Sequence, residues 1–376
     1  MEMWKMNILR YVCYGVYAAG LSCSALSKDR DLVIKPQEVG VYHGAFVDTD
    51  VDFTNEQSLT TNLNAFEHDT KINLDVVTIQ STWQDGIRYP ENAIKKIHEL
   101  GRIPLLRIIP VSDTKQETMT ADPIYDLRKL IQGDFDRDLE KLLCSMANLK
   151  GAKGERIRFM VVFGPEVNGY WYSYNGLHYG AGTKNGWGDR SYPDGPEIFR
   201  DAYRHIIDLS RRSDINADNI TWVQHFDMQG KPFEAWNSMH YYYAGDDYID
   251  WVGFSAFGAQ RQADLQWYNE FAEIVFNKSV LFKDRMQEFN AVSSKAYKAV
   301  LEFGVIEDPR LPERKARWIR DAFHVIKTRL PEIKLVNYWH ESAWDEGGYS
   351  DLRVNSSELA LDAYQNAVRD PYFQPQ

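Results

Sequence analysis

The sequence predicts a (β/α)8 barrel in a single domain. Eight short apolar segments rich in β-branched residues recur along the chain of 376 residues, with helical patterns between them. Each segment is continuously apolar rather than alternating, which is typical of parallel strands buried on both faces. Strands that alternate with helices in this number indicate a (β/α)8 barrel. A doubly wound open sheet is the alternative, but no GxGxxG motif follows the first strand to support it.

The elements follow in order along the chain. The expected strands cover residues 39–43, 74–80, 103–109, 157–163, 220–226, 249–255, 298–303 and 333–339. Helical spacing of apolar residues predicts helices over 91–100, 135–146, 198–209 and 314–330. The first of these helices ends before Gly101, a residue type that commonly terminates helices. We see no linker or low-complexity segment, so residues 28–376 are expected to form one domain.

The first 27 residues resemble an export signal. Lys5 and Arg10 precede a short apolar run over 11–21, and Ala25-Leu26-Ser27 supplies a small-x-small cleavage pattern. The run is too short to span a bilayer, which needs about 20 apolar residues. The protein is therefore expected to be secreted, periplasmic or on the cell surface, without stable membrane insertion. An N-terminal helix of the domain is one alternative, and a lipid anchor on Cys23 is another.

Composition excludes several function classes. The net charge is −11, which argues against binding to nucleic acid or to anionic lipid. Cys144 is the one cysteine after the signal, and the histidines show no HExxH spacing, so we expect no disulfide framework, metal or cofactor. The chain has 11 Trp, 22 Tyr and 18 Phe, an abundance that suits a groove for flat ligands such as sugar rings. The oligomeric state does not follow from the sequence.

Two glutamates lie near the C-terminal ends of predicted strands. In such a barrel these strand ends surround one opening, the mouth. Glu166 lies in Gly164-Pro165-Glu166, just after the fourth strand, and a loop rich in Gly and aromatics follows it to about Gly195. Glu302 ends the seventh strand within Leu301-Glu302-Phe303-Gly304. Active sites of these barrels lie at the strand C-termini, and paired carboxylates there are typical of glycoside hydrolysis. The alternative for Glu302 is a structural ion pair with Arg107.

The residues from Gly164 to Tyr172 resemble the acid/base motif of glycoside hydrolase family 26, a family best known for endo-β-1,4-mannanases. Residues 242–253, 301–304, 355–357 and 370–373 are also similar to that family. The resemblance implies that Glu166 is the general acid/base and Glu302 the nucleophile of a retaining mechanism. Their carboxyl groups are then expected about 5–5.5 Å apart. It further implies that Trp171 and Trp339 stack on sugar near the cleavage point, while Asn168 shapes the loop.

Two positions depart from the family pattern. Pro165 stands where the family has His, and Phe257 stands where it has Tyr, so both polar neighbours of the nucleophile are missing. His225, Gln224 and Tyr42 are candidates to replace them. The resemblance implies β-1,4-mannan as the default substrate of an endo-β-glycanase, and the departures leave mixed-linkage glucan, xylan and a bacterial exopolysaccharide as alternatives. They also motivate a catalytically silent carbohydrate-binding barrel as an alternative.

The remaining predicted mouth residues are expected to bind a polysaccharide or oligosaccharide. They are Tyr172, Arg107, His225, Tyr42 and Trp83, each close to a predicted strand end. Hydrolysis requires a protonated Glu166 and an ionised Glu302 at the same time. We therefore expect a bell-shaped pH profile on the acidic side of neutral.

Overall fold

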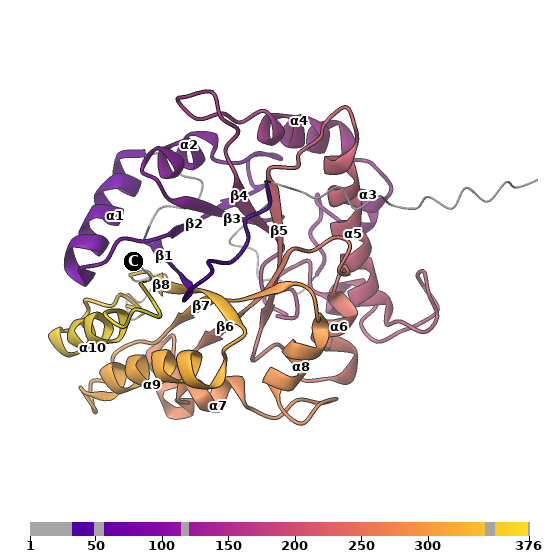
Figure 1. Cartoon of the computed structure of the whole chain (residues 1–376). Coiled ribbons are helices and arrows are strands. Elements are labelled where there is room, and N and C mark those ends of the chain that lie inside the picture. The colour runs from indigo at the N-terminus through magenta and orange to yellow at the C-terminus, as the bar shows by residue number, and fades with distance from the viewer. Residues whose placement is uncertain (1–31, 49–55, 114–119, 343–349, 375–376) are drawn as a thin grey trace, which may run out of the picture. The chain divides into compact units, whose positions relative to one another are not determined.

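Eight parallel strands, β1 to β8, close into a barrel in sequential order, which confirms the predicted (β/α)8 fold. The computed structural model describes residues 32–48, 56–113, 120–342 and 350–374. These belong to one unit that begins at Leu32, and its helices surround the strands (Figure 1). The expected signal, residues 1–27, lies outside the described residues. Among the described helices, none is both long and apolar enough to cross a membrane.

The strands agree with the predicted ones to within a few residues at each end. They are β1 Tyr42–Val47, β2 Val76–Thr82, β3 Ile103–Ile109, β4 Phe159–Phe163, β5 Ile220–Asp227, β6 Trp251–Phe257, β7 Tyr297–Gly304 and β8 Ile333–His340.

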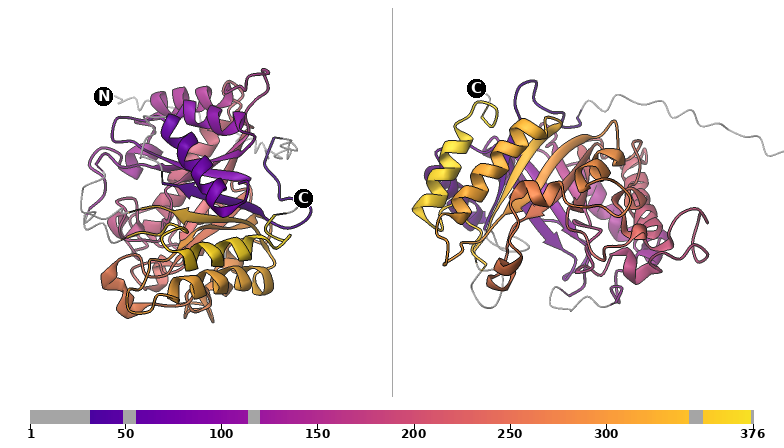
Figure 2. Two further views of the ribbon diagram at one scale, coloured as in Figure 1. Left: turned by 90° about the vertical axis from the view of Figure 1, so that its left-hand side faces the viewer. Right: turned by 90° about the horizontal axis from the view of Figure 1, so that it is seen from below.

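The helices include the four that were predicted, here α2, α4, α5 and α9, and several that the spacing of apolar residues did not reveal. The α-helices are α1 Glu56–Thr70, α2 Glu91–Glu99, α3 Leu127–Ile131, α4 Asp136–Ala147, α5 Asp194–Arg211, α6 Met239–Tyr242, α7 Phe271–Val275, α8 Arg285–Val292, α9 Arg314–Arg329 and α10 Glu358–Val368. Three short 3₁₀ turns are η1 Gly176–Tyr179, η2 Ala235–Asn237 and η3 Gln262–Trp267. The helices α9 and α10 lie side by side (Figure 2).

The first strand is displaced from its predicted place. It was expected over 39–43 but runs from Tyr42 to Val47, because the apolar run continues through Gly44. A Cβ at Gly44 would lie 2.6 Å from Oδ1 of Asn337 and about 3.0 Å from Val76, so the neighbouring strands approach too closely for a larger residue. Gly44 therefore allows close pairing inside the barrel instead of ending the strand.

The barrel interior changes character along its axis. Toward the strand N-termini it is filled by apolar side chains, among them Val76, Leu105, Val223, Leu301 and Leu335. Ile34 closes that end, since its carbonyl accepts a 2.8 Å hydrogen bond from the indole of Trp251. Two residues further along β3 and β5, the same inward face carries Arg107 and His225, because side chains on one face recur with a period of two.

A β-bulge in β7 turns Glu302 into the barrel. Val300 pairs with Phe254 of β6, but the next pair is Glu302 with Ser255, so Leu301 is an extra residue. Val300 and Phe303 pack in the outer core with the helices, while Leu301 belongs to the interior cluster. Strict alternation would send Glu302 outward; the bulge places both Leu301 and Glu302 on the inward face.

Candidate active site

Glu166 lies directly after β4 in a strained backbone conformation. Its φ of +51° is in the left-handed region, where a residue with a side chain is uncommon. The carboxyl group is 8% exposed, and its Oε2 accepts a 3.0 Å hydrogen bond from Nε1 of Trp171. Strained residues held by their surroundings are concentrated at functional sites.

Asn168 fixes the loop that carries Glu166. It is fully buried, its Nδ2 donates to the carbonyl of Asp227 at 2.8 Å, and its Oδ1 accepts from the Asp227 backbone N–H at 2.7 Å. The side chain of Asn237 in turn donates to the Asn168 carbonyl at 2.8 Å. Asn168 thus ties the β4 loop to the end of β5, which is a loop-shaping role rather than a substrate contact.

Glu302 faces a buried cation in the mouth. Nε of Arg107 lies 2.8 Å from Glu302 Oε1, and both side chains are at most 5% exposed. Nη1 of Arg107 donates to Gln80 on the neighbouring β2 at 2.8 Å, which orients the guanidinium. The sequence left open whether Glu302 is a structural ion-pair partner or a reacting group. The structure places it in an ion pair that is itself part of the mouth.

His225 takes the second position beside Glu302. Its Nδ1 lies 3.6 Å from Glu302 Oε1, and its Nε2 is 2.7 Å from the hydroxyl of Ser255. Burial and the charge of Arg107 hold the pKa of His225 well below its usual value, so the imidazole is neutral. Of the three candidates for replacing the missing polar neighbours, the structure brings His225 to Glu302. Gln224 instead bonds to the backbone of residues 242 and 244 on the outer side.

Tyr42 is the third candidate, and the structure does not bring it to the mouth. It begins β1 and packs with the apolar cluster at the strand N-termini, and its hydroxyl donates to the Lys35 carbonyl at 2.9 Å. The displaced first strand explains the difference, since Tyr42 would lie near a strand end only if β1 stopped at His43. Trp83 follows β2 as expected but is 1% exposed and packs against Tyr125 and Phe163.

Burial is the largest effect on the pKa values of the charged groups in the mouth, and neighbouring charges modify it. Burial raises the pKa of Glu302 well above its ordinary value, Arg107 opposes that rise, and Glu166 adds to it. Burial alone would lower the pKa of Arg107, but the charge of Glu302 together with Tyr172 and Glu166 outweighs this effect and the pKa is raised. Arg107 therefore stays charged, and it is the cation that favours ionised Glu302.

The predicted aromatic residues of the mouth differ in exposure. Trp171 is half-buried and its indole N–H reaches Glu166, whereas Trp339 is only 7% exposed. Phe46 stacks on Trp339 with ring centroids 4.2 Å apart, and the guanidinium of Arg107 lies 4.6 Å from the same ring. Trp339 consequently supports Arg107 more than it presents an open face. Tyr172 is half-buried, stacks on Tyr174 and hydrogen-bonds with Arg107.

Two further carboxyl groups lie at the mouth and were missed from the sequence. Asp227 is the last residue of β5 and is 8% exposed; Glu341 directly follows β8 and accepts a 2.7 Å hydrogen bond from Nε1 of Trp339. Both charges raise the pKa of Glu302. The signal that would have found them is the same as for the two glutamates, a carboxylate at the C-terminal end of an apolar strand.

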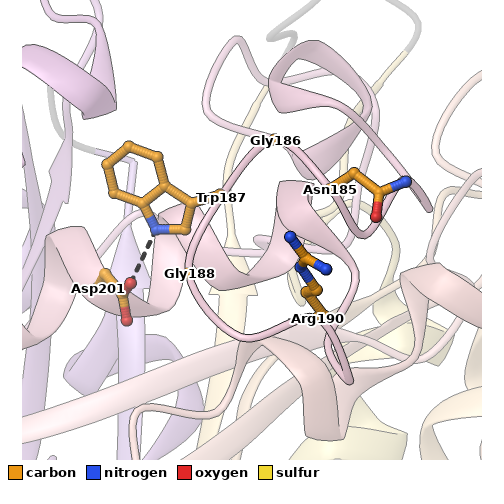
Figure 3. Close-up of a pocket in the computed structure, with 6 residues that line it drawn as sticks. All are labelled: Asn185, Gly186, Trp187, Gly188, Arg190 and Asp201. Atoms are coloured by element: carbon orange, nitrogen blue, oxygen red, sulfur yellow. Dashed lines mark hydrogen bonds between the residues drawn. The ribbon is translucent and has the colours of Figure 1, made fainter.

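A separate open pocket of about 550 Å³ lies on the loop after β4, against α5 (Figure 3). It is lined by Asn185, Gly186, Trp187, Gly188, Arg190 and Asp201. Its one carboxylate, Asp201, accepts from Nε1 of Trp187 at 2.9 Å and from Nε of Arg200 at 3.4 Å. A lone carboxylate that is already bonded does not provide the pair of carboxyl groups that the mouth provides. Within the described residues, no group of His, Cys, Asp and Glu is arranged to hold a metal ion.

A (β/α)8 barrel with one glutamate after β4 and another on β7, in one buried mouth, is an arrangement typical of glycoside hydrolases that use paired carboxyl groups. The sequence profile described as glycosyl hydrolase family 26 matches residues 171–299, which confirms the predicted resemblance to that family. The matched segment contains neither Glu166 nor Glu302. The match therefore assigns no role to either glutamate.

Several known proteins are similar to this chain in sequence or in fold. Endoglucanase H of Acetivibrio thermocellus is 27% identical over 214 residues, which are 54% of this chain but only 19% of that relative. The catalytic domain of a Bacillus sp. JAMB-750 endo-β-1,4-mannanase has a TM-score of 0.60 at 14% identity, covering 89% of this chain and 86% of the other. A family 26 β-mannanase from Bacteroides ovatus has a TM-score of 0.58 at 14% identity, covering 89% and 90%. At such identities the structural likeness shows the fold alone.

Proposed function

We propose that this protein is an exported, retaining endo-β-glycanase in which Glu166 is the general acid/base and Glu302 the nucleophile. The observation that carries the proposal is that both glutamates lie in one buried mouth and act on each other electrostatically. Export rests on the signal-like residues 1–27 alone. A neutral polysaccharide suits the acidic chain better than a polyanionic one, because like charges repel.

The proposed reaction has two steps. Glu302 attacks the anomeric carbon while Glu166 gives a proton to the leaving oxygen, which produces a glycosyl-enzyme; water then releases the sugar with Glu166 acting as base. Arg107 opposes the rise in the pKa of Glu302 and so favours its ionised form in the first step. The hydrogen bond from Trp171 holds the Glu166 carboxyl in one orientation.

The relatives leave two substrates to distinguish. β-1,4-mannan is supported by the mannanases that share the fold, and a β-glucan by the name of the relative Endoglucanase H. The decisive experiment digests soluble mannan, mixed-linkage glucan, xylan and a bacterial exopolysaccharide with the wild type, Glu166→Gln and Glu302→Gln. Release of oligosaccharides from one polymer identifies the substrate, and loss of that release in both variants supports the assigned roles.

Two outcomes would contradict parts of the proposal. A wild type that binds the polymers but releases no oligosaccharide would favour the catalytically silent barrel. Product analysis by NMR tests the stereochemistry: the first-formed reducing end should keep the β configuration, as expected for carboxyl groups about 5–5.5 Å apart. An α product would replace the retaining mechanism by an inverting one.

A further inference from the structure

The mouth contains a third carboxyl group, Asp227, to which the proposed two-step reaction assigns no role. Asp227 ends β5 two residues after His225 and four after Val223, so it shares the inward face of that strand. It is 8% exposed, as Glu166 is. A carboxylate is costly to bury unless other groups compensate its charge, so its position calls for a physical reason.

The backbone holds Asp227 against the loop of Glu166. The two hydrogen bonds with Asn168, at 2.7 and 2.8 Å, join the Asp227 backbone to a residue two positions after Glu166. The backbone N–H of Gln229 donates to Oδ1 of Asp227 and fixes the carboxyl group itself. The loops therefore keep the two acids together rather than apart.

The carboxyl groups of Glu166 and Asp227 are hydrogen-bonded to each other. Two carboxyl groups in such a bond need one proton between them, so the pair carries a single negative charge. Burial, and then the charge of Glu166, raise the pKa of Asp227 well above its usual value. The other charged groups that face Asp227 are Glu302 on β7 and Arg285 on α8, whose Nη1 is 3.0 Å from Oε2 of Glu288.

We propose that Asp227 is a positioning residue that shares one proton with Glu166 and keeps this proton available for the leaving oxygen. The inference rests on the proposed function. In the first step the shared proton moves to the leaving oxygen as Glu302 forms the bond to the anomeric carbon. Two adjacent carboxylates then remain, which makes the pair a stronger base for the next step. The attacking water returns one proton to the pair, its oxygen bonds to the anomeric carbon, and Glu302 leaves as a carboxylate.

The test is Asp227→Asn in the full chain, on the polysaccharide that the wild type degrades. Asparagine keeps the size of the side chain and the backbone bonds to Asn168 but cannot share the proton. The alkaline limb of the kcat/KM profile is expected to move to lower pH by about one unit, since the neighbouring charge no longer retains the proton. A dinitrophenyl glycoside of the released sugar needs little acid assistance, so its glycosylation rate should fall much less than that of the polymer.

A purely structural role predicts a different result. It would lower both rates together without moving the alkaline limb, and that outcome overturns the inference. Asp227→Ser also lacks the carboxyl group and serves if the asparagine variant folds poorly. Asp250→Asn is the matched control, because Asp250 precedes β6 at the opposite barrel end and accepts from the Trp222 backbone at 2.8 Å; its profile should equal the wild type's. A wild type that is inactive on every polymer would instead refute the proposed function.

Discussion

The two ends of the barrel interior are built from the same eight strands but carry different kinds of side chain. At the strand N-termini the inward side chains are apolar and belong to one cluster that includes Val223, Leu301 and Leu335. At the C-termini the same strands contribute Arg107, His225, Asp227 and Glu302, all under 9% exposed. The side chains at both ends are buried, so the two ends differ chiefly in charge.

This difference separates the part of the barrel that stabilises the fold from the part that carries the reactive groups. Apolar burial stabilises by about 25 cal/mol for each Å² removed from water, whereas buried carboxyl groups cost free energy unless they are paired. The apolar end therefore stabilises the barrel and offsets the free energy needed to bury the charged groups at the other end. Leu301 and Glu302 are adjacent in sequence yet belong to opposite sides of this division.

The strongest test of the division compares these two neighbours. Glu302→Gln is expected to lower kcat by at least about 1,000-fold, because the nucleophile is lost. Leu301→Ala is expected to lower the free energy of unfolding by about 2–5 kcal/mol while the folded fraction keeps most of its kcat. Denaturant titration and initial rates measure the two effects. An equal loss of kcat in both variants would show that stability and activity do not belong to separate ends of the barrel.

The second test removes the cation from the mouth. In Arg107→Met the pKa of Glu302 should rise further, so the acidic limb of the pH–rate profile moves to higher pH by about 1–2 units. Stability should also fall by about 3–5 kcal/mol, since an unpaired carboxyl group stays buried. Arg107→Lys keeps the charge and is the matched control, with the limb close to that of the wild type. An unmoved limb in Arg107→Met would mean that Glu302 does not set it.

The sequence predicted the apolar end better than the charged end. Strand positions follow from continuous apolar runs, and β3 was predicted with its observed bounds, Ile103–Ile109. The error at β1 came from Gly44, whose close contact with Asn337 depends on a strand almost 300 residues away along the chain. The inward turn of Glu302 depends on the bulge at Leu301, and the carboxyl pair of Glu166 and Asp227 depends on the loop bonded by Asn168. Neither leaves a pattern in local composition, because both arise from pairing between distant segments.

The third test concerns polar groups that are buried outside the mouth. Burial lowers the pKa of His43 to about 4, and burial with the charges of Lys315 and Arg353 lowers that of His340 to about 3. Below the unfolded value of about 6.5 the unfolded chain binds protons that the native chain does not, so stability is present above pH 6.5 and is lost as pH falls. Each histidine should remove about 2 kcal/mol between pH 7 and pH 5.

Denaturant titration of His43→Gln at these two pH values should show a pH dependence smaller by that amount. His324→Gln is the control, because this side chain is exposed on α9 and its replacement should leave the dependence unchanged. An unchanged dependence in His43→Gln would mean that the imidazole is protonated in the native state. The region around His43 would then contain a buried charge, as the mouth does, and the two regions would no longer differ in this respect.

The smallest expected effect tests how finely the charged end is arranged. Trp171→Phe keeps an aromatic ring but removes the 3.0 Å hydrogen bond to Oε2 of Glu166. A hydrogen bond to a charged group is worth about 1.5 kcal/mol, so kcat/KM should fall roughly tenfold. Tyr170→Phe is the matched control on the adjacent residue, which is 49% exposed, and its rate should be unchanged. If Trp171 acts instead by stacking on sugar, Phe retains much of that contact and KM changes more than kcat. A fall in kcat at constant KM would therefore indicate that Trp171 orients the carboxyl group of Glu166. The charged end would then extend beyond the strand ends into the strained loop after β4.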